Sequence, residues 1–355
     1  MINADENRVQ LLREAVARQP RVGLAHLPTP IDRCRRLSDE LGGPQIWIKR
    51  DDLTGLATGG NKTRMFEFLL GEAVDQGADA VVAGAAIQSN NCRQLAAACA
   101  KLGLRCHLIL RQLESDPFDS IQGNLLLDLI VGAQVEIVQA DGWATQGELI
   151  RQKAKVLEES GHSVYVARVG DESRLGLWAV GYVNGFIELV EQAEALETYI
   201  DELWVCSSDT TLAGLLVAAK FTNSPMRLKG VSAIGEPVTG SSFPQLISDT
   251  ANQCADMLGL EIEITPEDVD CSTDYVGPGY SVPSDAGLEA IWLVGRTEGI
   301  LLDPSYSSKA MAALIEHVRL GKVSSEGDIV FLHTGGVPAL FAQHQNLGIE
   351  ELLDR

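Results

Sequence analysis

Short apolar segments alternate with longer amphipathic segments along most of the chain. The short segments predict β-strands at residues 45–49, 80–84, 106–110, 135–138, 164–167, 203–206, 229–234 and 328–333. Apolar residues at helical spacing predict helices from residue 62 and at 90–102, 120–131, 145–159, 175–195, 212–220, 243–258, 285–298 and 307–320. Strands that alternate with helices of this length are typical of a mostly parallel sheet covered by helices. The pattern predicts an α/β protein.

The N-terminal residues are expected to precede this regular part. Residues 5–19 predict an amphipathic helix, an extension ahead of the main fold. Residues 26–30 (HLPTP) should be extended, because a proline disfavours the helical conformation of the residue before it. Residues 33–41 predict a short helix that ends at Gly42.

Composition limits the classes of function. The 355 residues suggest about two domains, and neither a low-complexity linker nor an internal repeat separates them. The chain has 28 Lys and Arg against 49 Asp and Glu, a formal net charge of −21. Such acidity argues against nucleic acid or an anionic membrane as a partner.

Cysteine usage and the apolar runs point to the cytoplasm. No basic region followed by an apolar core opens the sequence, and the apolar runs are too short to span a bilayer. The seven cysteines are scattered and odd in number, which does not suggest a disulfide framework. Cys92, Cys99 and Cys106 have no further Cys or His at ligand spacing beside them, so buried small side chains are expected there rather than a metal site.

Candidate chemistry lies in the loops that follow the strands, where ligands bind on parallel sheets. Residues 55–64 (GLATGGNKTR) combine three glycines, which allow close backbone approach to a ligand, with Lys62 at an expected helix start. That lysine could hold phosphate as a point charge or form a Schiff base with an aldehyde cofactor. A solvated lysine in a plain loop is the remaining interpretation.

Three further loops carry polar residues: 88–93 (QSNNCR), 207–214 (SSDTTLAG) and 334–338 (TGGVP). Ser89 in the first of these loops, and the hydroxyls of residues 207–214, suit either helix capping or the binding of an anion at a helix N-terminus. Asp209 would repel a phosphate there and favours capping. Tyr280 and Tyr306, both among turn residues, suit either packing or proton transfer.

A nucleotide-binding P-loop is disfavoured. That motif reads G-x-x-x-x-G-K-[ST], whereas Asn61 stands directly before Lys62 and Gly55 lies one position too far upstream. The spacing does not form the phosphate cradle.

At this point the chain resembles the D-cysteine desulfhydrase and 1-aminocyclopropane-1-carboxylate (ACC) deaminase family of pyridoxal phosphate (PLP) enzymes. The resemblance runs from about His26 to Phe341, and its motifs occur in the family's order. They are HLPTP, IKRDD, TGGNKTR, QSNNCRQLAAACAKLG, GLWAVGYV, GPGYSVP, LDPSYSSKAM and HTGGVPALF.

The resemblance implies a role for each candidate residue. Lys62 would be the Schiff-base lysine, Asn90 would hold the ring oxygen of PLP, and Thr334 would face the pyridine nitrogen. The phosphate would be held by Thr210, Thr211, Ala213 and Gly214. The substrate carboxylate would face Gln88, Ser89 and Asn91. The catalytic residues would be Lys62, Ser89, Tyr280 and Tyr306, with no metal.

The resemblance also implies an architecture of the tryptophan-synthase-β type. Two three-layer α/β domains with mostly parallel twisted sheets would enclose PLP in the cleft between them. The large domain would comprise residues 1–64 and 172–355, with 1–22 as the helical extension, and the small inserted domain residues 65–171. A cytoplasmic homodimer is expected from the family.

The expected reaction is α,β-elimination on a small β-substituted amino acid, with D-cysteine as the first substrate and L-cysteate as the alternative. A neutral Thr334 at the pyridine nitrogen would favour prompt expulsion of the β-substituent. Met65 replaces a usual lysine, and Ser208, Asp209 and Thr210 replace a glycine-rich phosphate loop, so the phosphate site is less positive. These two changes motivate another alternative, a member that binds a small amino acid without PLP catalysis.

Two more departures concern the substrate. Asn91 stands where the family often has histidine, which hints at a shifted substrate. Ser307 replaces the glutamate that follows the second tyrosine in ACC deaminases, which disfavours an ACC-deaminase-like reaction.

Overall fold

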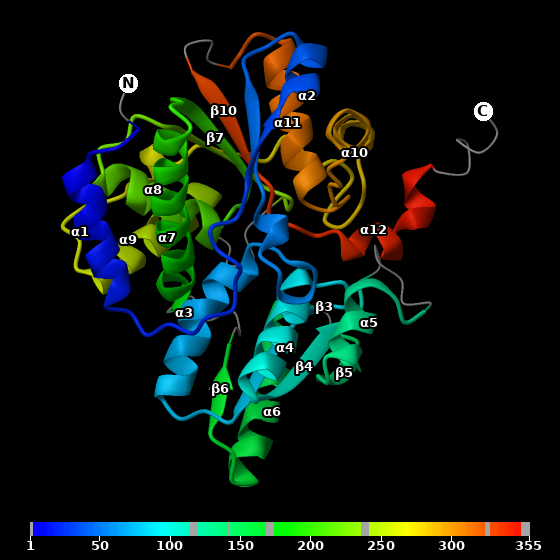
Figure 1. The fold of residues 1–355 in the computed structure, drawn as a ribbon. Coiled ribbons are helices and arrows are strands. Elements are labelled where there is room, and N and C mark those ends of the chain that lie inside the picture. Colours follow the sequence, from blue (N-terminus) through cyan, green and yellow to red (C-terminus); the bar gives the residue numbers. More distant parts are fainter. Residues whose placement is uncertain are drawn as a thin grey trace.

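The computed structural model describes residues 3–113, 120–140, 142–167, 174–235, 241–323 and 327–348, which form two separate sheets (Figure 1). The larger sheet has the strand order β1 (Ile31–Cys34), β2 (Ile46–Lys49), β10 (Asp328–Leu332), β7 (Ile200–Cys206), β8 (Arg227–Val231) and β9 (Cys271–Ser272). Its pairings are parallel except for the antiparallel pair of β1 and β2.

Helices cover both faces of the larger sheet. Along β7, Leu203 and Val205 join the apolar cluster of one face, and Trp204 joins that of the other, because successive side chains of a strand alternate in direction. The first face is covered by α1 (Glu6–Ala17), α3 (Lys62–Asp75), α7 (Leu175–Ala195), α8 (Thr210–Phe221) and α9 (Phe243–Leu258). The second face is covered by α2 (Arg35–Leu41), α10 (Asp285–Glu298) and α11 (Ser307–Arg319).

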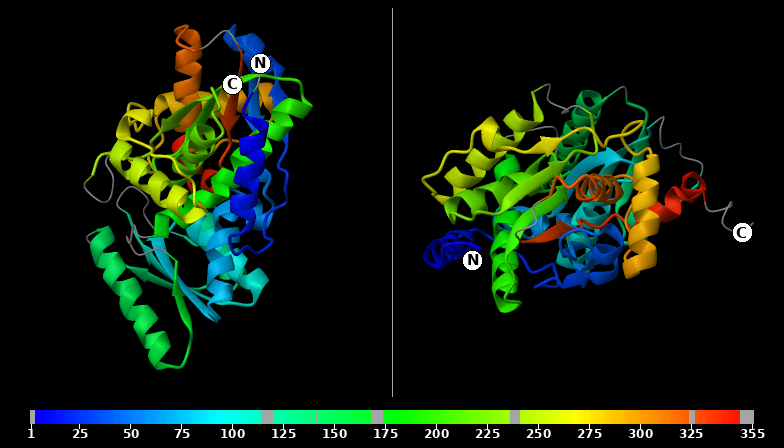
Figure 2. Two further views of the ribbon diagram at one scale, coloured as in Figure 1. Left: turned by 90° about the vertical axis from the view of Figure 1, so that its left-hand side faces the viewer. Right: turned by 90° about the horizontal axis from the view of Figure 1, so that it is seen from above.

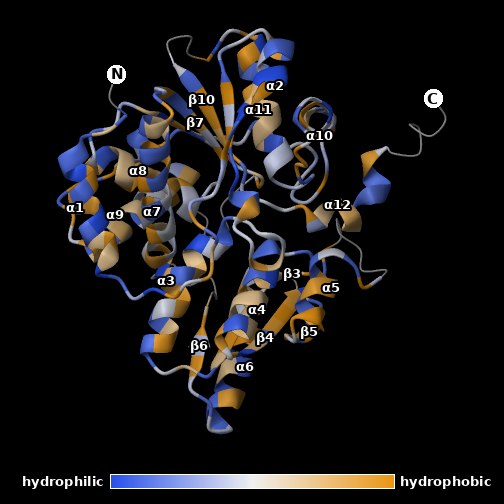
Figure 3. Cartoon of the chain, in the orientation of Figure 1, coloured by the Kyte–Doolittle hydropathy of each residue, from blue (hydrophilic) through white to orange (hydrophobic). Residues whose placement is uncertain are grey.

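The smaller sheet is entirely parallel and also lies between helices. Its order is β5 (Gln134–Val138), β4 (Arg105–Arg111), β3 (Ala80–Ala86) and β6 (Val164–Val166). Val81 packs toward α4 (Asn90–Leu102), and Val82 packs toward α6 (Trp143–Glu159). Figure 2 shows the helices of this region from two further sides. The hydrophobic colour along β3 and β4 in Figure 3 reflects this burial on both faces.

The remaining elements are short, except for α5 (Gly123–Ile130), which packs on α4. They are α12 (Pro338–Ala342), η1 (Asp51–Leu53), η2 (Leu56–Thr58), η4 (Pro266–Asp268) and η5 (His344–Leu347). Four residues of α1, including Leu12, are buried, and α1 packs on α7 and α8. In the described ranges, no helix is both long enough and apolar enough to span a membrane.

The predicted α/β class with two mostly parallel sheets is confirmed, with local corrections. Helix α2 begins at Arg35 rather than at residue 33, because 31–34 pair with β2 as a strand. Strand β8 ends at Val231 rather than at 234, and the two-residue β9 was not predicted. The strands of the smaller sheet lie between residues 80 and 166. The division into domains at 64/65 and 171/172 stays a prediction, and its second boundary lies outside the described residues.

Candidate functional site

Lys62 is the first residue of α3, as the sequence predicts, and its neighbour ties it to two distant elements. The backbone N–H of Asn61 donates to the carbonyl oxygen of Thr334, 3.0 Å away, at the end of β10. The side-chain amide of Asn61 donates to Thr211 Oγ1 at 3.1 Å, in the first turn of α8. Three predicted cofactor-binding positions, Lys62, Thr211 and Thr334, are thereby brought together.

The charge of Lys62 acts on the end of β7. Burial raises the pKa of the Cys206 thiol, and the ammonium of Lys62 partly opposes that rise. Cys206 is the last residue of β7 and the loop to α8 follows it. The lysine therefore lies on the side of the large sheet where the carboxyl ends of its parallel strands meet.

Glycines allow the loops around Lys62 to approach each other. Gly60 and Gly335 have φ values of 129° and 93°, a region that side chains disfavour. A Cβ atom on Gly335 would lie 2.7 Å from the Cα of Gly60. The glycines are needed because the backbone of the Lys62 loop packs directly against the loop after β10.

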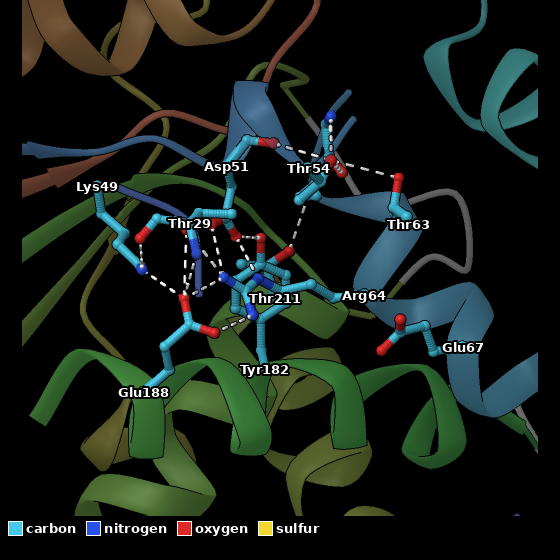
Figure 4. Close-up of polar contacts among 12 residues, drawn as sticks. Thr29, Lys49, Asp51, Thr54, Thr63, Arg64, Glu67, Tyr182, Glu188 and Thr211 are labelled. Atoms are coloured by element: carbon cyan, nitrogen blue, oxygen red, sulfur yellow. Dashed lines mark hydrogen bonds and ion pairs between the residues drawn. The ribbon is translucent and has the colours of Figure 1, made fainter. Parts of the chain in front are cut away.

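A buried ion network fixes the first turn of α3 from behind (Figure 4). Arg64, two residues after Lys62, donates from Nε to Asp51 Oδ2 at 2.7 Å and from Nη2 to Glu188 Oε1 at 2.8 Å. The side chains of Arg64 and Asp51 are each 1% exposed. Burial raises the pKa of Asp51, but the Arg64 charge more than offsets this, and the pKa falls to about 2.

The network continues to β2 and α7. Lys49 Nζ lies 2.5 Å from Glu188 Oε1, and the hydroxyl of Tyr182 donates to Asp51 Oδ2 at 2.6 Å. Thr29 Oγ1 donates to Asp51 Oδ1 at 2.7 Å. Opposite charges and hydrogen bonds satisfy both carboxylates, so the network anchors the Lys62 helix without providing a free group for chemistry.

The start of α8 offers hydroxyls and N–H groups, as a phosphate site would require. Thr210 and Thr211 are buried in its first turn. Asp209 occupies the N-cap position, but its side chain makes no capping bond. Instead the hydroxyl of Ser207 accepts from the N–H of Leu212 at 3.1 Å. The loop therefore caps the helix, as one sequence interpretation expected, but the capping side chain is that of Ser207 rather than Asp209.

The other two predicted phosphate residues lie deeper in α8. The N–H of Ala213 donates to the carbonyl of Asp209 at 3.1 Å, as in an ordinary helical turn. A Cβ atom on Gly214 would strike the backbone of Ala179 in α7, so this glycine serves close helix packing. Thr210 and Thr211 are the better placed pair for a phosphate at the helix N-terminus.

The loop from Gln88 to Asn91 leads from β3 into α4. Ser89 is the N-cap of α4, and its Oγ accepts from the N–H of Cys92 at 3.2 Å. The carbonyl oxygen of the Gln88 side chain accepts from the N–H of Asn124 at 2.9 Å, which fixes the loop to α5. Asn91 Oδ1 is buried and has no hydrogen-bond partner within the described residues.

Arg93 connects this loop to the Lys62 loop, a link that the sequence interpretation missed. Its guanidinium donates to the carbonyl of Ala57, the hydroxyl of Thr58 and, at 3.1 Å, the carbonyl of Gly59. It also lies 3.4 Å from Oδ1 of Asn90, the residue expected at the cofactor ring. Arg93 thus couples the two loops that carry Lys62 and Asn90. Its place inside the predicted α4 gave no sign of this contact.

Tyr280 and Tyr306 meet, although they are far apart in the sequence. Their hydroxyls form a hydrogen bond, and their rings lie edge to face with centroids 5.9 Å apart. Burial, followed by the neighbouring Tyr280, raises the pKa of Tyr306 well above its ordinary value. The contact between these tyrosines was not predicted, and their role with substrate stays a prediction.

The groups around Lys62 fit PLP, the cofactor expected from the sequence. Lys62 supplies an amine for its aldehyde, and Thr210 and Thr211 supply donors at a helix start for its phosphate. The close approach of Gly60 to Gly335 leaves no room for a side chain between the Lys62 loop and the loop after β10. Asp209 Oδ1, 3.4 Å from Thr210 Oγ1, is the one unfavourable group in this set.

Comparisons with known proteins point to the same cofactor. Residues 22–335 match the model of a family described as pyridoxal-phosphate dependent enzyme. The chain is 40% identical to a D-cysteine desulfhydrase of Klebsiella pneumoniae (strain 342) and 39% identical to one of Salmonella typhi, with 94% of this chain and 98% of each relative covered. The crystal structure of an ACC deaminase homologue superposes with a TM-score of 0.85 at 32% identity, covering 95% of this chain and 98% of that one.

Proposed function

Because the chain belongs to the family of pyridoxal-phosphate-dependent enzymes, we propose that it catalyses α,β-elimination on a small β-substituted amino acid, with D-cysteine as its first substrate. The observation that carries the proposal is the convergence of Lys62, Thr211 and Thr334 through the two hydrogen bonds of Asn61. The near full-length similarity to D-cysteine desulfhydrases supports the choice of substrate.

The chain's own residues would bind the substrate and move protons. PLP, when bound, withdraws electrons from the α-carbon of the amino acid. Lys62 would hold the cofactor aldehyde and then, as a free amine, take the α-proton. Asn90 and Thr334 would orient the ring, and Thr210 and Thr211 would hold the phosphate.

The substrate carboxylate would be bound at the start of α4. The donors for this would be the hydroxyl of Ser89 and the side-chain amide nitrogen of Asn91. Gln88 would act indirectly, because its side chain already holds Asn124. The paired hydroxyls of Tyr280 and Tyr306 would accept or return a proton on the opposite side.

The overall reaction balances without an oxidant. The α-proton leaves to the Lys62 amine, the Cβ–S bond breaks, and its electron pair leaves with sulfur as hydrosulfide. The resulting enamine takes up water and yields pyruvate and ammonium. With L-cysteate, the second candidate substrate, the same steps release sulfite.

The structure gives a reason to rank ACC last. Ser307, at the position of the glutamate of ACC deaminases, donates from Oγ to Asp303 Oδ1 at 2.6 Å and accepts from the Asp303 N–H at 2.8 Å. Its hydroxyl is therefore occupied in the turn before α11, and it cannot replace a free carboxylate in opening the ring.

We also propose a cytoplasmic homodimer. All seven cysteines are free and six of them are buried, which suits a reducing compartment. Leu129 and Ile130 of α5 and Phe341 of the adjoining α12 are exposed by 43%, 68% and 67%, as expected of a surface that a second copy covers. Light scattering that gives the mass of one 38.2 kDa chain would refute the dimer.

The first experiment is an absorbance spectrum with and without added PLP, followed by borohydride reduction and peptide mapping. The wild type should show a cofactor band that is lost on reduction, with the label on Lys62. Lys62→Ala should lose the label and all turnover, whereas Lys155→Ala, at an exposed position on α6, should retain both.

The outcome decides between the enzyme and the binding protein. If Lys62→Ala kept both the label and turnover, the assignment of Lys62 would be wrong. If the wild type bound no PLP even at high concentration, the less positive phosphate site around Asp209 and Met65 would favour a protein that binds an amino acid without this chemistry. Release of 2-oxo acid from D-cysteine, L-cysteate or ACC then ranks the substrates.

A further inference from the structure

Arg111 lies at the edge of the smaller sheet that carries the Gln88–Asn91 loop. It is the last residue of β4 and pairs in register with Ala86, the last residue of β3. Its carbonyl accepts from the N–H of Ile87 at 3.1 Å, directly before Gln88. Because β3 and β4 are parallel, the side chain of Arg111 and the loop proposed to bind the substrate carboxylate belong to the same edge.

The guanidinium of Arg111 is held in place but not neutralised. It lies over the ring of Trp143, the first residue of α6, at 4.4 Å from the centroid. Its Nε is buried without a hydrogen-bond partner, and no carboxylate of the described residues forms an ion pair with it. Arg50 and Arg64, by contrast, both pair with aspartates. A positioned cation without a counter-ion suits an anionic ligand.

Tyr280, from the part of the chain that builds the larger sheet, is near the guanidinium of Arg111. Burial lowers the pKa of Arg111, and Tyr280 is near enough to oppose that shift. Tyr280 in turn bonds Tyr306. Arg111 therefore lies on the sheet edge that carries the carboxylate loop and within electrostatic reach of Tyr280, one of the two tyrosines proposed to line the substrate side.

We propose that Arg111 is a specificity-determining residue that binds an anionic group on the β-carbon of the substrate, so that the site accepts a β-sulfonate amino acid such as cysteate in addition to D-cysteine. This inference rests on the proposed elimination at the same site. The Cβ–S bond breaks, its electron pair leaves with the sulfonate group as sulfite, and the α-proton leaves to Lys62. The sulfonate is already anionic before the bond breaks, so the fixed cation binds it in the ground state as well as in the transition state.

The test compares anionic and neutral β-substituents in Arg111→Gln, Arg111→Lys and the matched control Arg105→Gln. Arg105 is the first residue of the same strand and is exposed at its opposite end. For L-cysteate and D-cysteate, Arg111→Gln should lower kcat/KM about 30-fold, or about 2 kcal/mol at 1.4 kcal/mol per tenfold change, mainly through KM. D-Cysteine and β-chloroalanine should change less than about threefold, because a charge-assisted bond to the β-group is absent in their ground state.

The two remaining variants calibrate this result. Arg111→Lys should recover part of the loss, because it keeps the charge without the planar fork of donors, and Arg105→Gln should match the wild type. An equal loss for all four substrates would show that Arg111 binds the α-carboxylate instead. No loss for cysteate would show that Arg111 only packs on Trp143. Either result overturns the proposal.

Binding separates this inference from the proposed function. In Lys62→Ala, which cannot turn over substrate, calorimetry should show that L-cysteate binds more tightly than L-serine, and Arg111→Gln on that background should remove the preference. If wild-type protein released no 2-oxo acid but this binding pattern held, the elimination would be wrong and the anion site right. If turnover occurred but the preference were absent in both backgrounds, the elimination would stand and the inference about Arg111 would be wrong.

Discussion

Around Arg64, opposite charges and hydrogen bonds satisfy the buried carboxylates, whereas around the smaller sheet many buried polar atoms have no partner. Asp51 accepts from Arg64, Thr29 and Tyr182. Of the twelve buried side-chain atoms without a hydrogen bond in the described part of the chain, nine belong to residues 91–146. They include Asn91 Oδ1, Arg111 Nε and both oxygens of Asp128.

The contrast suggests different roles for the two regions: the Arg64 network supports α3, and the region around the smaller sheet would bind the substrate. A network in which every polar group has a partner holds its residues in one conformation. That property suits the Arg64 network, which supports the first turn of α3 behind Lys62. Unpartnered polar atoms cost stability unless water or a ligand completes them. Most of them belong to the smaller sheet and its helices, the part of the described chain that also carries the Gln88–Asn91 loop.

The largest effect is expected from breaking the network. Asp51→Asn should lower the free energy of unfolding by about 3–5 kcal/mol, because it leaves the buried Arg64 charge only partly compensated. Urea denaturation measures this. Glu289→Gln, in the exposed pair with Arg319, should change it by less than about 1 kcal/mol. Equal effects of the two variants would show that the network contributes no more than a surface pair.

The same carboxylate sets the acid stability. The pKa of Asp51 is lowered to about 2 in the folded chain, so the unfolded chain binds the proton more readily. The stabilisation is therefore complete above the ordinary pKa of an aspartate and is lost as the pH falls toward 2. Asp51→Asn should accordingly show a shallower loss of stability than the wild type below about pH 4.

An effect of opposite sign is expected at Asp128 in α5. Burial raises its pKa to about 8, although the charge of Arg93 opposes this. Between about pH 4 and 8 the folded chain then holds a proton that the unfolded chain has released, so stability falls as the pH rises. Asp128→Asn cannot ionise and should lack this loss.

Denaturation at several pH values tests that sign. The unfolding free energy of Asp128→Asn minus that of the wild type should increase with pH between about 5 and 8, by at most about 1.4 kcal/mol per pH unit. Glu159→Gln, at a carboxylate on α6 that is 67% exposed and pairs with Lys155, should show no such trend in this range. A difference that stayed flat for Asp128→Asn would mean that Asp128 is paired in solution.

The sequence was sufficient for the sheets and for the Lys62 loop, but not for either polar region. Apolar strands and helical periodicity are local signals, and glycines before a lysine are a recognisable pattern. The network instead joins Arg64 to Glu188, 124 residues away, and reads in the sequence only as charged residues that should be exposed. Arg111 has no motif, and its stacking on Trp143 depends on the register of β4 and β5.

Short elements were missed for a related reason. Strand β1 contains Asp32 and Arg33, and its pairing with β2 rather than its own composition makes it a strand. The two residues of β9 are too few for any periodic signal. The Asn61 contacts that bring Lys62, Thr211 and Thr334 together are likewise long-range, so the residues were predictable one by one but their contacts were not.

The smallest effect is expected from loosening Arg111 without removing it. Trp143→Leu removes the ring under the guanidinium while leaving the charge, and an exposed cation–π contact is worth about 0.5–1 kcal/mol. It should lower kcat/KM for L-cysteate about threefold and leave D-cysteine unchanged. The control is Trp292→Leu, which removes a similar stack with Arg296 in α10, far from the carboxylate loop in sequence, and should affect neither substrate. A loss for D-cysteine as large as that for cysteate would mean that Trp143 shapes the site as a whole. The charge of Arg111 would then not distinguish the region around the smaller sheet from the Arg64 network.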